Sequence, residues 1–174
     1  IIELVGLRRT GKSTLLFQLI NFLLNENTAP HNVWYFSFDE EQCSLDELFV
    51  EFQKQTKKDI NQDKLFVFLD EIQKLESFQS SLKVYYDLYP NIKIFISGST
   101  SLFIKKKTQE SLTGRLFSVT LHPLGFDEYL DFVDKSTMLQ LPEMYHKELE
   151  MEYERYVSHQ FVETLFIENT DRKS

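Results

Sequence analysis

Short apolar runs alternate with longer amphipathic segments along most of the chain. The runs have the length and composition of buried strands, and they cover residues 1–5, 33–38, 65–69, 92–96 and 116–121. The segments between them have the length, apolar spacing or capping signals of helices, and they cover residues 12–25, 44–55, 75–88 and 102–111. Strands that alternate with helices predict an α/β fold with a parallel sheet.

The C-terminal part of the chain has no strand pattern. Residues 126–133 predict an amphipathic helix, and the apolar and aromatic residues from Pro142 onward predict further helices. We therefore expect a core in residues 1–132, followed in residues 133–174 by a helical segment that begins a lid or a C-terminal region.

The loop between the first strand and the first helix fits the pattern G-x-x-x-x-G-K-[ST], because it reads Gly6-Leu7-Arg8-Arg9-Thr10-Gly11-Lys12-Ser13. The glycines allow successive N–H groups to surround an anion, and the helix N-terminus adds partial positive charge. Lys12 can reach the β- and γ-phosphates of ATP, Ser13 can ligate Mg²⁺, and Thr14 can contact the α-phosphate. The alternative is a simple turn, which explains the glycines but not the spacing.

Two acids, Asp70 and Glu71, follow the uninterrupted apolar run of residues 65–69. Ligands of open α/β sheets bind at the carboxyl ends of the strands, so these acids are placed at the ligand edge. Asp70 is the candidate metal ligand, and Glu71 is the candidate that orients and polarises the attacking water. Acids after a strand are common, but downstream of a phosphate-binding loop they form a Walker B pattern.

Two other predicted strands deliver polar groups to the same edge. Residues 39–41 (Asp-Glu-Glu) either face the substrate or are solvated and helix-capping acids. Residues 97–100 (Ser-Gly-Ser-Thr) either sense the γ-phosphate or form a turn. The sequence leaves both alternatives open.

Composition restricts the partners more than it restricts the fold. The chain has 174 residues, 42% of them hydrophobic, which is enough for a packed core. Its net charge of -8 argues against a nucleic-acid footprint across the whole domain. We expect nucleic-acid binding only through a C-terminal region that this sequence lacks. The lysines at 105–107 are either a solvated helix face or a local basic cluster.

Cysteine content and hydropathy suggest a cytoplasmic protein without a membrane partner. A single cysteine, Cys43, cannot form an internal disulfide, which suits a reducing cytoplasm, and the alternative is that it is just a small buried residue. No signal peptide is visible, and the longest apolar stretch, residues 15–24, is too short and too interrupted to span a bilayer. The chain begins inside a strand without Met, so we interpret it as a fragment.

Five blocks of sequence, in order, resemble the AAA-type ATPases of archaea and bacteria, in which the ATPase domain precedes a winged-helix and/or nuclease-like region. The blocks are residues 6–13, 70–74, 97–99, 112–115 and 121–130. The resemblance covers residues 1 to about 132. It agrees with a strand between the two Walker motifs and with a Glu directly after the Walker B Asp, features typical of the catalytic-glutamate branch of P-loop ATPases.

The resemblance implies a three-layer α/β/α P-loop fold whose parallel sheet has the order 5-1-4-3-2. It places Ser97 or Ser99 at the sensor position, and we take Ser99 as the catalytic candidate. It also makes Arg115 an arginine finger that reaches a neighbouring subunit's nucleotide, which implies a homo-oligomer. The alternative for Arg115 is a surface or structural arginine that pairs with a nearby acid.

The sequence thus predicts an enzyme that binds ATP or ADP and hydrolyses ATP with Mg²⁺, coupling hydrolysis to a conformational change of an attached effector region. Two alternatives stay open. One is a nucleotide-regulated switch or binding module with negligible turnover, and Glu71 weighs against it. The other is a P-loop kinase, against which Asp70, Glu71 and the late Arg115 weigh.

Overall fold

The computed structural model describes residues 1–40, 43–98 and 112–158. The chain divides into two compact units, Ile1–Leu121 and His122–Ser174. This division comes before the helix at Phe126–Phe132, whose aromatic side chains pack against those of a later helix. The boundary after residue 132, between a core and a helical segment that begins a lid or a C-terminal region, stays a prediction. Among the described residues, every helix is too short or too polar to cross a membrane.

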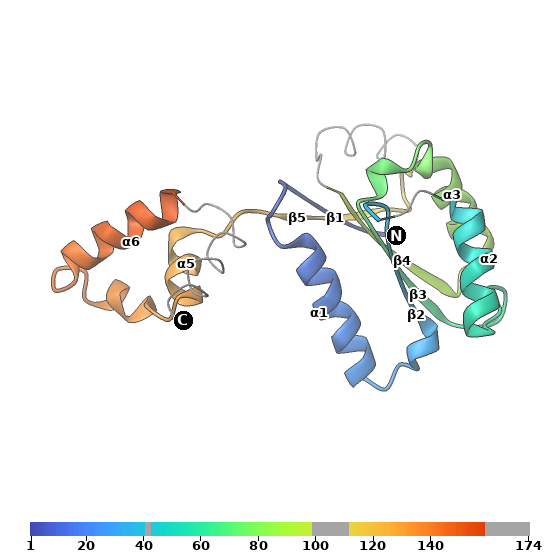
Figure 1. Cartoon of the computed structure of the whole chain (residues 1–174), viewed down its shortest axis with the longest axis horizontal. Helices are drawn as coiled ribbons and strands as arrows, with labels where there is room; N and C mark the ends of the chain where they lie inside the picture. The colour runs from blue at the N-terminus through green and yellow to red at the C-terminus, as the bar shows by residue number, and fades with distance from the viewer. Residues whose placement is uncertain (41–42, 99–111, 159–174) are drawn as a thin grey trace. The chain divides into compact units, whose positions relative to one another are not determined.

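A five-stranded parallel sheet organises the first unit (Figure 1). Its strands are β1 (Ile2–Gly6), β2 (Val33–Ser37), β3 (Leu65–Asp70), β4 (Ile92–Gly98) and β5 (Phe117–Leu121). The spatial order is β2-β3-β4-β1-β5, which confirms the predicted order 5-1-4-3-2. All five predicted strands are present, with small changes at their ends.

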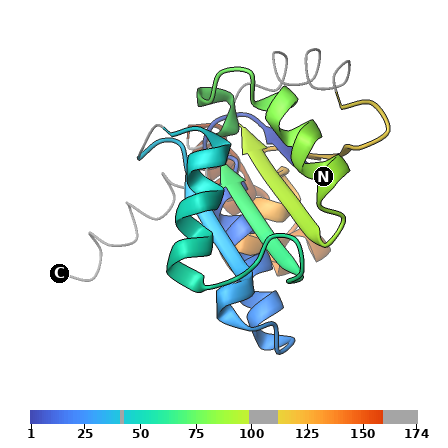
Figure 2. The same cartoon turned by 90° about the vertical axis from the view of Figure 1, so that its right-hand side faces the viewer.

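Helices cover both faces of this sheet (Figures 1 and 2). They are α1 (Lys12–Asn25) on one face and α2 (Leu45–Thr56) and α3 (Phe78–Leu88) on the other. Side chains alternate along a strand, so Phe68 packs on the α1 side with Leu16, while Val67 and Leu69 join the cluster of α2 and α3. The predicted three-layer architecture is therefore confirmed. The predicted helix at 102–111 lies outside the described residues.

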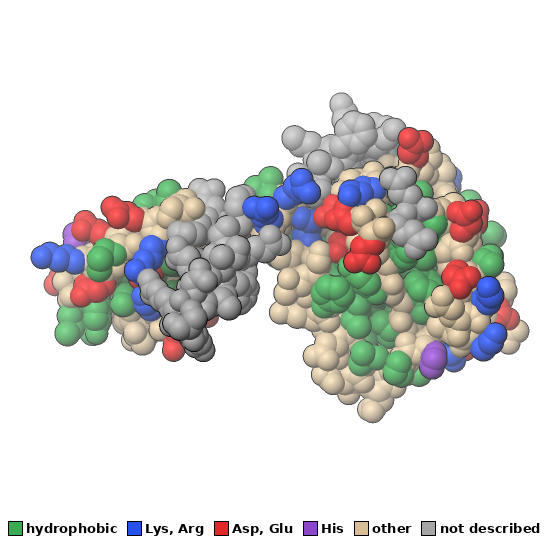
Figure 3. Space-filling view, in the orientation of Figure 1, with side chains coloured by type: hydrophobic (Ala, Val, Ile, Leu, Met, Phe, Trp, Pro, Cys, Tyr) green, Lys and Arg blue, Asp and Glu red, His purple; other side chains and the backbone are tan. Residues whose placement is uncertain are grey.

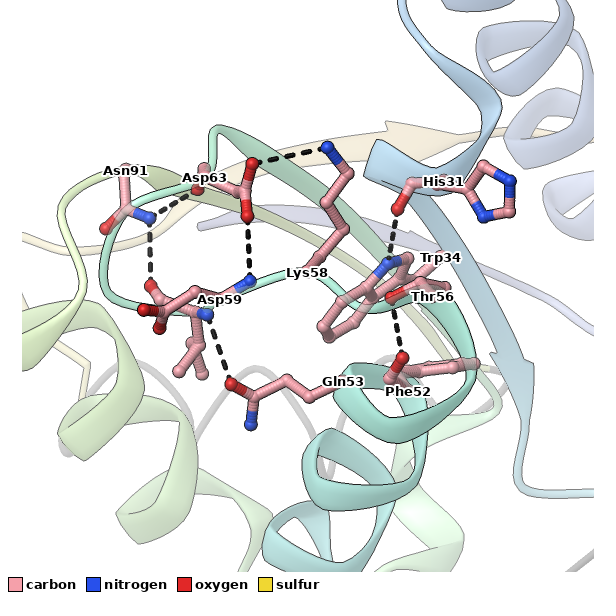
Figure 4. Close-up of polar contacts among 10 residues, drawn as sticks. His31, Trp34, Phe52, Gln53, Thr56, Lys58, Asp59, Asp63 and Asn91 are labelled. Carbon is pink, nitrogen blue, oxygen red and sulfur yellow. Dashed lines mark hydrogen bonds and ion pairs between the residues drawn. The ribbon is translucent and has the colours of Figure 1, made fainter.

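Local hydrogen bonds begin α2 and shape the loop that leads from it to β3, and Figure 4 shows those of the loop. The predicted capping box begins the helix, since the Glu47 N–H donates to Ser44 Oγ at 3.2 Å and the Ser44 N–H to Glu47 Oε2 at 2.9 Å. In the loop, Ile60 N–H donates to Gln53 Oε1 at 3.1 Å, and Asn91 Nδ2 donates to the Ile60 carbonyl at 2.9 Å. The polar loop predicted from sequence is thus anchored to its neighbours.

Short 3₁₀ helices complete the first unit. They lie at Pro30–Asn32, before β2, and at Ile72–Lys74, directly after the paired acids. The second of these turns matters for the site, because it carries the chain away from the end of β3.

The second unit is helical, with α5 (Phe126–Phe132), a 3₁₀ helix at Ser136–Gln140 and α6 (His146–Ser158). Phe126 and Tyr129 of α5 contact Tyr156 of α6, with ring centroids 5.6 and 5.5 Å apart. The predicted helical character of this part of the chain is confirmed as far as residue 158.

A buried carboxylate holds the helices of this unit together. Glu152 is 5% exposed, and its oxygens accept hydrogen bonds from Tyr129 (3.0 Å), Lys135 (2.6 Å) and Arg155 (2.9 Å). Burial alone would raise the pKa of Glu152, but the hydrogen bonds from Lys135 and Tyr129 and the charges of Lys135 and Arg155 lower it below its ordinary value.

We expect Glu152→Gln to lower the free energy of unfolding by about 1–3 kcal/mol, because two cations lose their anionic partner. Chemical denaturation measures this, and Glu154→Gln, an exposed change on the same helix, is the matched control. Because the folded pKa of Glu152 is depressed, its stabilising contribution is present above the unfolded value of 4.5 and is lost as the pH falls through the folded pKa. Equal stability of the two variants at pH 7 would contradict the assignment.

Candidate functional site

The loop at residues 6–13 joins the end of β1 to the start of α1. The geometry of the backbone requires glycine at both of its glycine positions, Gly6 and Gly11. A Cβ on Gly6 would lie 2.4 Å from the carbonyl oxygen of Leu121 on β5. Gly11 has a φ of +87°, a conformation that L side chains rarely adopt. Gly11 is also the N-cap of α1 and has no side chain to cap the helix, so first-turn N–H groups are left for an anion.

The Lys12 side chain lies inside this loop. It is 5% exposed, and its Nζ donates to the Leu7 carbonyl at 2.6 Å, which also accepts a bond from Thr10 Oγ1 at 2.9 Å. Burial lowers the pKa of Lys12, while the negative charges of Glu71 and Asp70 act in the opposite direction. The two acids are therefore close enough to Lys12 of the loop for their charges to act on its ammonium group.

Asp70 ends β3 and is 3% exposed, with three hydrogen-bond donors around its carboxylate. Tyr35 donates to Oδ2 at 3.1 Å, and the Glu71 N–H donates to Oδ1 at 3.0 Å. The Ser97 hydroxyl also donates to Oδ1. This arrangement gives the carboxylate one orientation at the end of the sheet.

The chain turns sharply at Glu71, whose φ of 53° lies in the left-handed region. Such a backbone conformation is unfavourable for a residue with a side chain and clusters at functional sites. The Glu71 carboxylate accepts a hydrogen bond from Gln73 Nε2, two residues further along the 3₁₀ turn. Glu71 thus lies near enough to Lys12 of the loop to interact with its charge, and its side chain is hydrogen-bonded to Gln73.

Of the other polar groups predicted at this edge, the structure brings Ser97 into the site and gives Asp39 another partner. Ser97 is fully buried and bonds to Asp70, whereas Asp39 forms an ion pair with Lys74. The ion pair agrees with the interpretation of Asp39 as a surface acid. Glu41 and Ser99 lie outside the described residues.

Arg115 lies near the amino ends of the strands, whereas the loop lies at their carboxyl ends. Phe117 begins β5 beside Ile2, whereas Leu121 ends it beside Gly6, so the strand separates Arg115 from the loop by about 15 Å. Arg115 Nε and Nη2 donate to the two carboxylate oxygens of Asp87 on α3, at 2.7 and 3.0 Å. The structure therefore places Arg115 away from the loop at residues 6–13 of its own chain and pairs it with an acid.

Two site residues, Tyr35 and Gln73, escaped the sequence reasoning. Tyr35 lies in a strand rich in aromatic residues, so its hydroxyl carried no signal that distinguished it from a core side chain. Burial and the charge of Asp70 raise the pKa of Tyr35, so the hydroxyl stays protonated as a donor. Gln73 belongs to the block at 70–74, but nothing in that block distinguishes it as a site residue. Figure 3 shows acidic, basic and hydrophobic side chains adjoining on one face of this unit.

A loop of the pattern G-x-x-x-x-G-K-[ST] that leads from a strand into a helix, with a buried acid at the end of another strand of the same sheet, is typical of a P-loop NTPase. The sheet order and the helices on both faces agree with this class. Residues 1–130 match the model of the family described as "AAA domain", and the chain belongs to that family.

Two similar proteins show that the chain spans only part of its relatives. An uncharacterized protein of Haemophilus influenzae is 30% identical over 156 residues, covering 87% of this chain and 37% of the relative. Uncharacterized protein MJ1544 of Methanocaldococcus jannaschii is 33% identical over 132 residues, covering 73% of this chain and 27% of the relative.

Solved structures share the fold at low sequence identity. The ORC2 protein of Aeropyrum pernix, solved in ADPNP and ADP complexes, has a TM-score of 0.54 at 16% identity, covering 79% of this chain and 46% of that one. Cdc6p of Pyrobaculum aerophilum has a TM-score of 0.50 at 16% identity, covering 78% and 42%. At this identity the likeness concerns the fold.

Proposed function

We propose that this domain binds ATP together with Mg²⁺ and hydrolyses the ATP. The observation that carries the proposal is the burial of Lys12 in the loop, under the electrostatic influence of Asp70 and Glu71. The residues present fit the ligands. Gly6 and Gly11 place no side chain at two positions of the loop backbone, and the Ser13 hydroxyl and the Asp70 carboxylate are the hard oxygen donors that Mg²⁺ prefers.

Each residue of the loop and of β3 has a distinct task in this proposal. Lys12 exchanges the Leu7 carbonyl for β- and γ-phosphate oxygens, and Thr14 contacts the α-phosphate. Ser13 and Asp70 hold the metal, which when bound offsets the negative charge of the phosphates. Glu71 orients and polarises the attacking water, for which its carboxylate keeps acceptor positions beside the bond from Gln73 to Oε2. Ser99 remains our candidate for sensing the γ-phosphate.

Arg115 is proposed to act on the nucleotide of a second copy of the chain. Its place at the opposite end of the strands from the loop argues against a role at the loop of its own subunit. A planar and always charged guanidinium is suited to stabilise charge on the transferred phosphoryl oxygens. A homo-oligomer would follow, in which Arg115 exchanges Asp87 for phosphate.

The relatives support a larger protein around this domain, since the chain covers 37% and 27% of the two described above. We propose that ATP hydrolysis is coupled to the conformation of an attached effector region, with a winged-helix or nuclease-like part as the candidate. Contact with nucleic acid would come through that region.

One observation favours a second function, a nucleotide-regulated switch with negligible turnover. The Gln73 side chain donates to Glu71 Oε2 and so restricts the orientation of the Glu71 carboxylate. If this bond holds the carboxylate away from the attacking water when ATP is bound, hydrolysis is slow and the bound nucleotide sets the state of the protein. An ATPase assay with and without added phosphoryl acceptors separates the ATPase, the switch and a kinase.

We expect Lys12→Ala to weaken ATP binding by about 2–4 kcal/mol, because a charge that meets phosphate oxygens in a partly desolvated loop is removed. Titration calorimetry with a non-hydrolysable ATP analogue measures the change. Lys54→Ala on α2, where the side chain is 74% exposed, is the matched control and should bind as the parent does. Unchanged affinity in a folded Lys12→Ala variant would contradict nucleotide binding by this loop.

A further inference from the structure

Tyr35 connects the helix that follows the phosphate-binding loop to the acid at the end of β3. Its ring packs against Phe17 of α1, with ring centroids 4.8 Å apart. Its hydroxyl lies 3.1 Å from Asp70 Oδ2, although the two residues are far apart in sequence. Tyr35 and Asp70 lie on neighbouring parallel strands, in which Ser37 is the register partner of Asp70. The tyrosine therefore reaches the carboxylate from the adjacent strand.

The two carboxylate oxygens of Asp70 are not equivalent. Oδ1 accepts from the Ser97 hydroxyl and from the Glu71 N–H, which fills its two principal acceptor positions. Oδ2 accepts from Tyr35 and keeps one further acceptor position. A metal ion, or a water bound to it, would therefore approach Oδ2, the oxygen that Tyr35 holds.

We infer that Tyr35 is a positioning residue for Mg²⁺, because its hydroxyl fixes the metal-facing oxygen of Asp70 and its ring is supported by Phe17. This inference rests on the proposed function. Groups that hydrogen-bond to a metal ligand change metal affinity without touching the metal, since they determine where the ligand's free lone pair points.

A different role would be purely structural, with the hydroxyl simply joining β2 to β3. The chain supplies a matched comparison on the other face of the sheet. Tyr85 of α3 donates to Asp46 Oδ1 of α2 at 2.7 Å, and it is 7% exposed. Removing either hydroxyl deletes one tyrosine–carboxylate bond from the same unit, but only Tyr35 contacts the candidate metal ligand.

The experiment compares the dissociation constant of ADP with Mg²⁺ and with EDTA by titration calorimetry, for the parent, Tyr35→Phe, Tyr85→Phe and Asp70→Asn. The ratio of the two constants measures how much Mg²⁺ strengthens binding, and it does not depend on turnover. We expect Tyr35→Phe to reduce this ratio by about 5- to 20-fold, with binding in EDTA unchanged. Tyr85→Phe should leave the ratio unchanged, and Asp70→Asn should abolish the gain.

The outcomes separate the inference from the proposed function. If folded Tyr35→Phe keeps the ratio of the parent, or if Tyr85→Phe lowers it equally, Tyr35 has no positioning role. If the parent binds ADP with no gain from Mg²⁺, the proposed metal-dependent function itself fails. Ser97→Ala gives a second test. In this variant Oδ1 of Asp70 still accepts from the Glu71 N–H. In Tyr35→Phe, by contrast, Oδ2 of Asp70 loses its one described donor. A larger loss in Ser97→Ala than in Tyr35→Phe would overturn the assignment of Oδ2.

Discussion

Glu71→Gln is expected to leave ATP bound while turnover falls by about 10²–10⁴-fold. Glutamine keeps the size and polarity of the side chain but loses the negative charge that helps polarise water. Its side-chain oxygen still accepts the bond from Gln73, so the left-handed turn at residue 71 should persist. Binding and rate should therefore be uncoupled in this variant.

Single-turnover hydrolysis and calorimetry on the same preparation test this expectation. Glu76→Gln, the same chemical change at an exposed position a few residues later, should behave as the parent. Asp70→Asn should differ from both, because it weakens Mg²⁺-dependent binding. If Glu71→Gln hydrolyses ATP at the parent rate, catalysis belongs to another residue. If the parent itself barely turns over, the slow switch is the better account.

Arg115→Ala is expected to bind ATP normally and to lose about 10³-fold in the rate of hydrolysis. Specific activity of the parent should also rise with protein concentration, because the site would be incomplete in a single chain. The ion pair with Asp87 offers a discriminating control. If Arg115 serves only that pair, Asp87→Asn should impair activity as much as Arg115→Ala does. If Arg115 serves a neighbouring nucleotide, Asp87→Asn should retain activity.

Mixing two inactive variants tests directly whether Arg115 acts between subunits. Lys12→Ala has an intact Arg115 and a defective loop, while Arg115→Ala has the reverse. Mixed assemblies should regain activity at interfaces that join an intact loop to an intact Arg115. Absence of recovery, in a mixture shown by light scattering to assemble together, would rule out this arrangement.

The sequence by itself was sufficient to predict the features that residues close together in the chain determine. Strand and helix periodicity predicted the described elements of the core, and Ser44 with Glu47 predicted the start of α2. The loop motif and the two acids after an apolar strand predicted the chemistry that we propose, because their spacing is local. The sheet order, by contrast, came from resemblance to a family, since periodicity does not say which strands are neighbours.

Only the tertiary structure decided which distant side chains meet. Tyr35 and Ser97 reach Asp70 from two other strands, and an aromatic residue in an apolar strand has the same pattern whether it faces a core or a site. The ion pair of Arg115 with Asp87 likewise depends on where β5 begins relative to α3. Local periodicity determines the elements, but strand order, register and packing across the sheet determine their contacts, and these are properties of the whole chain.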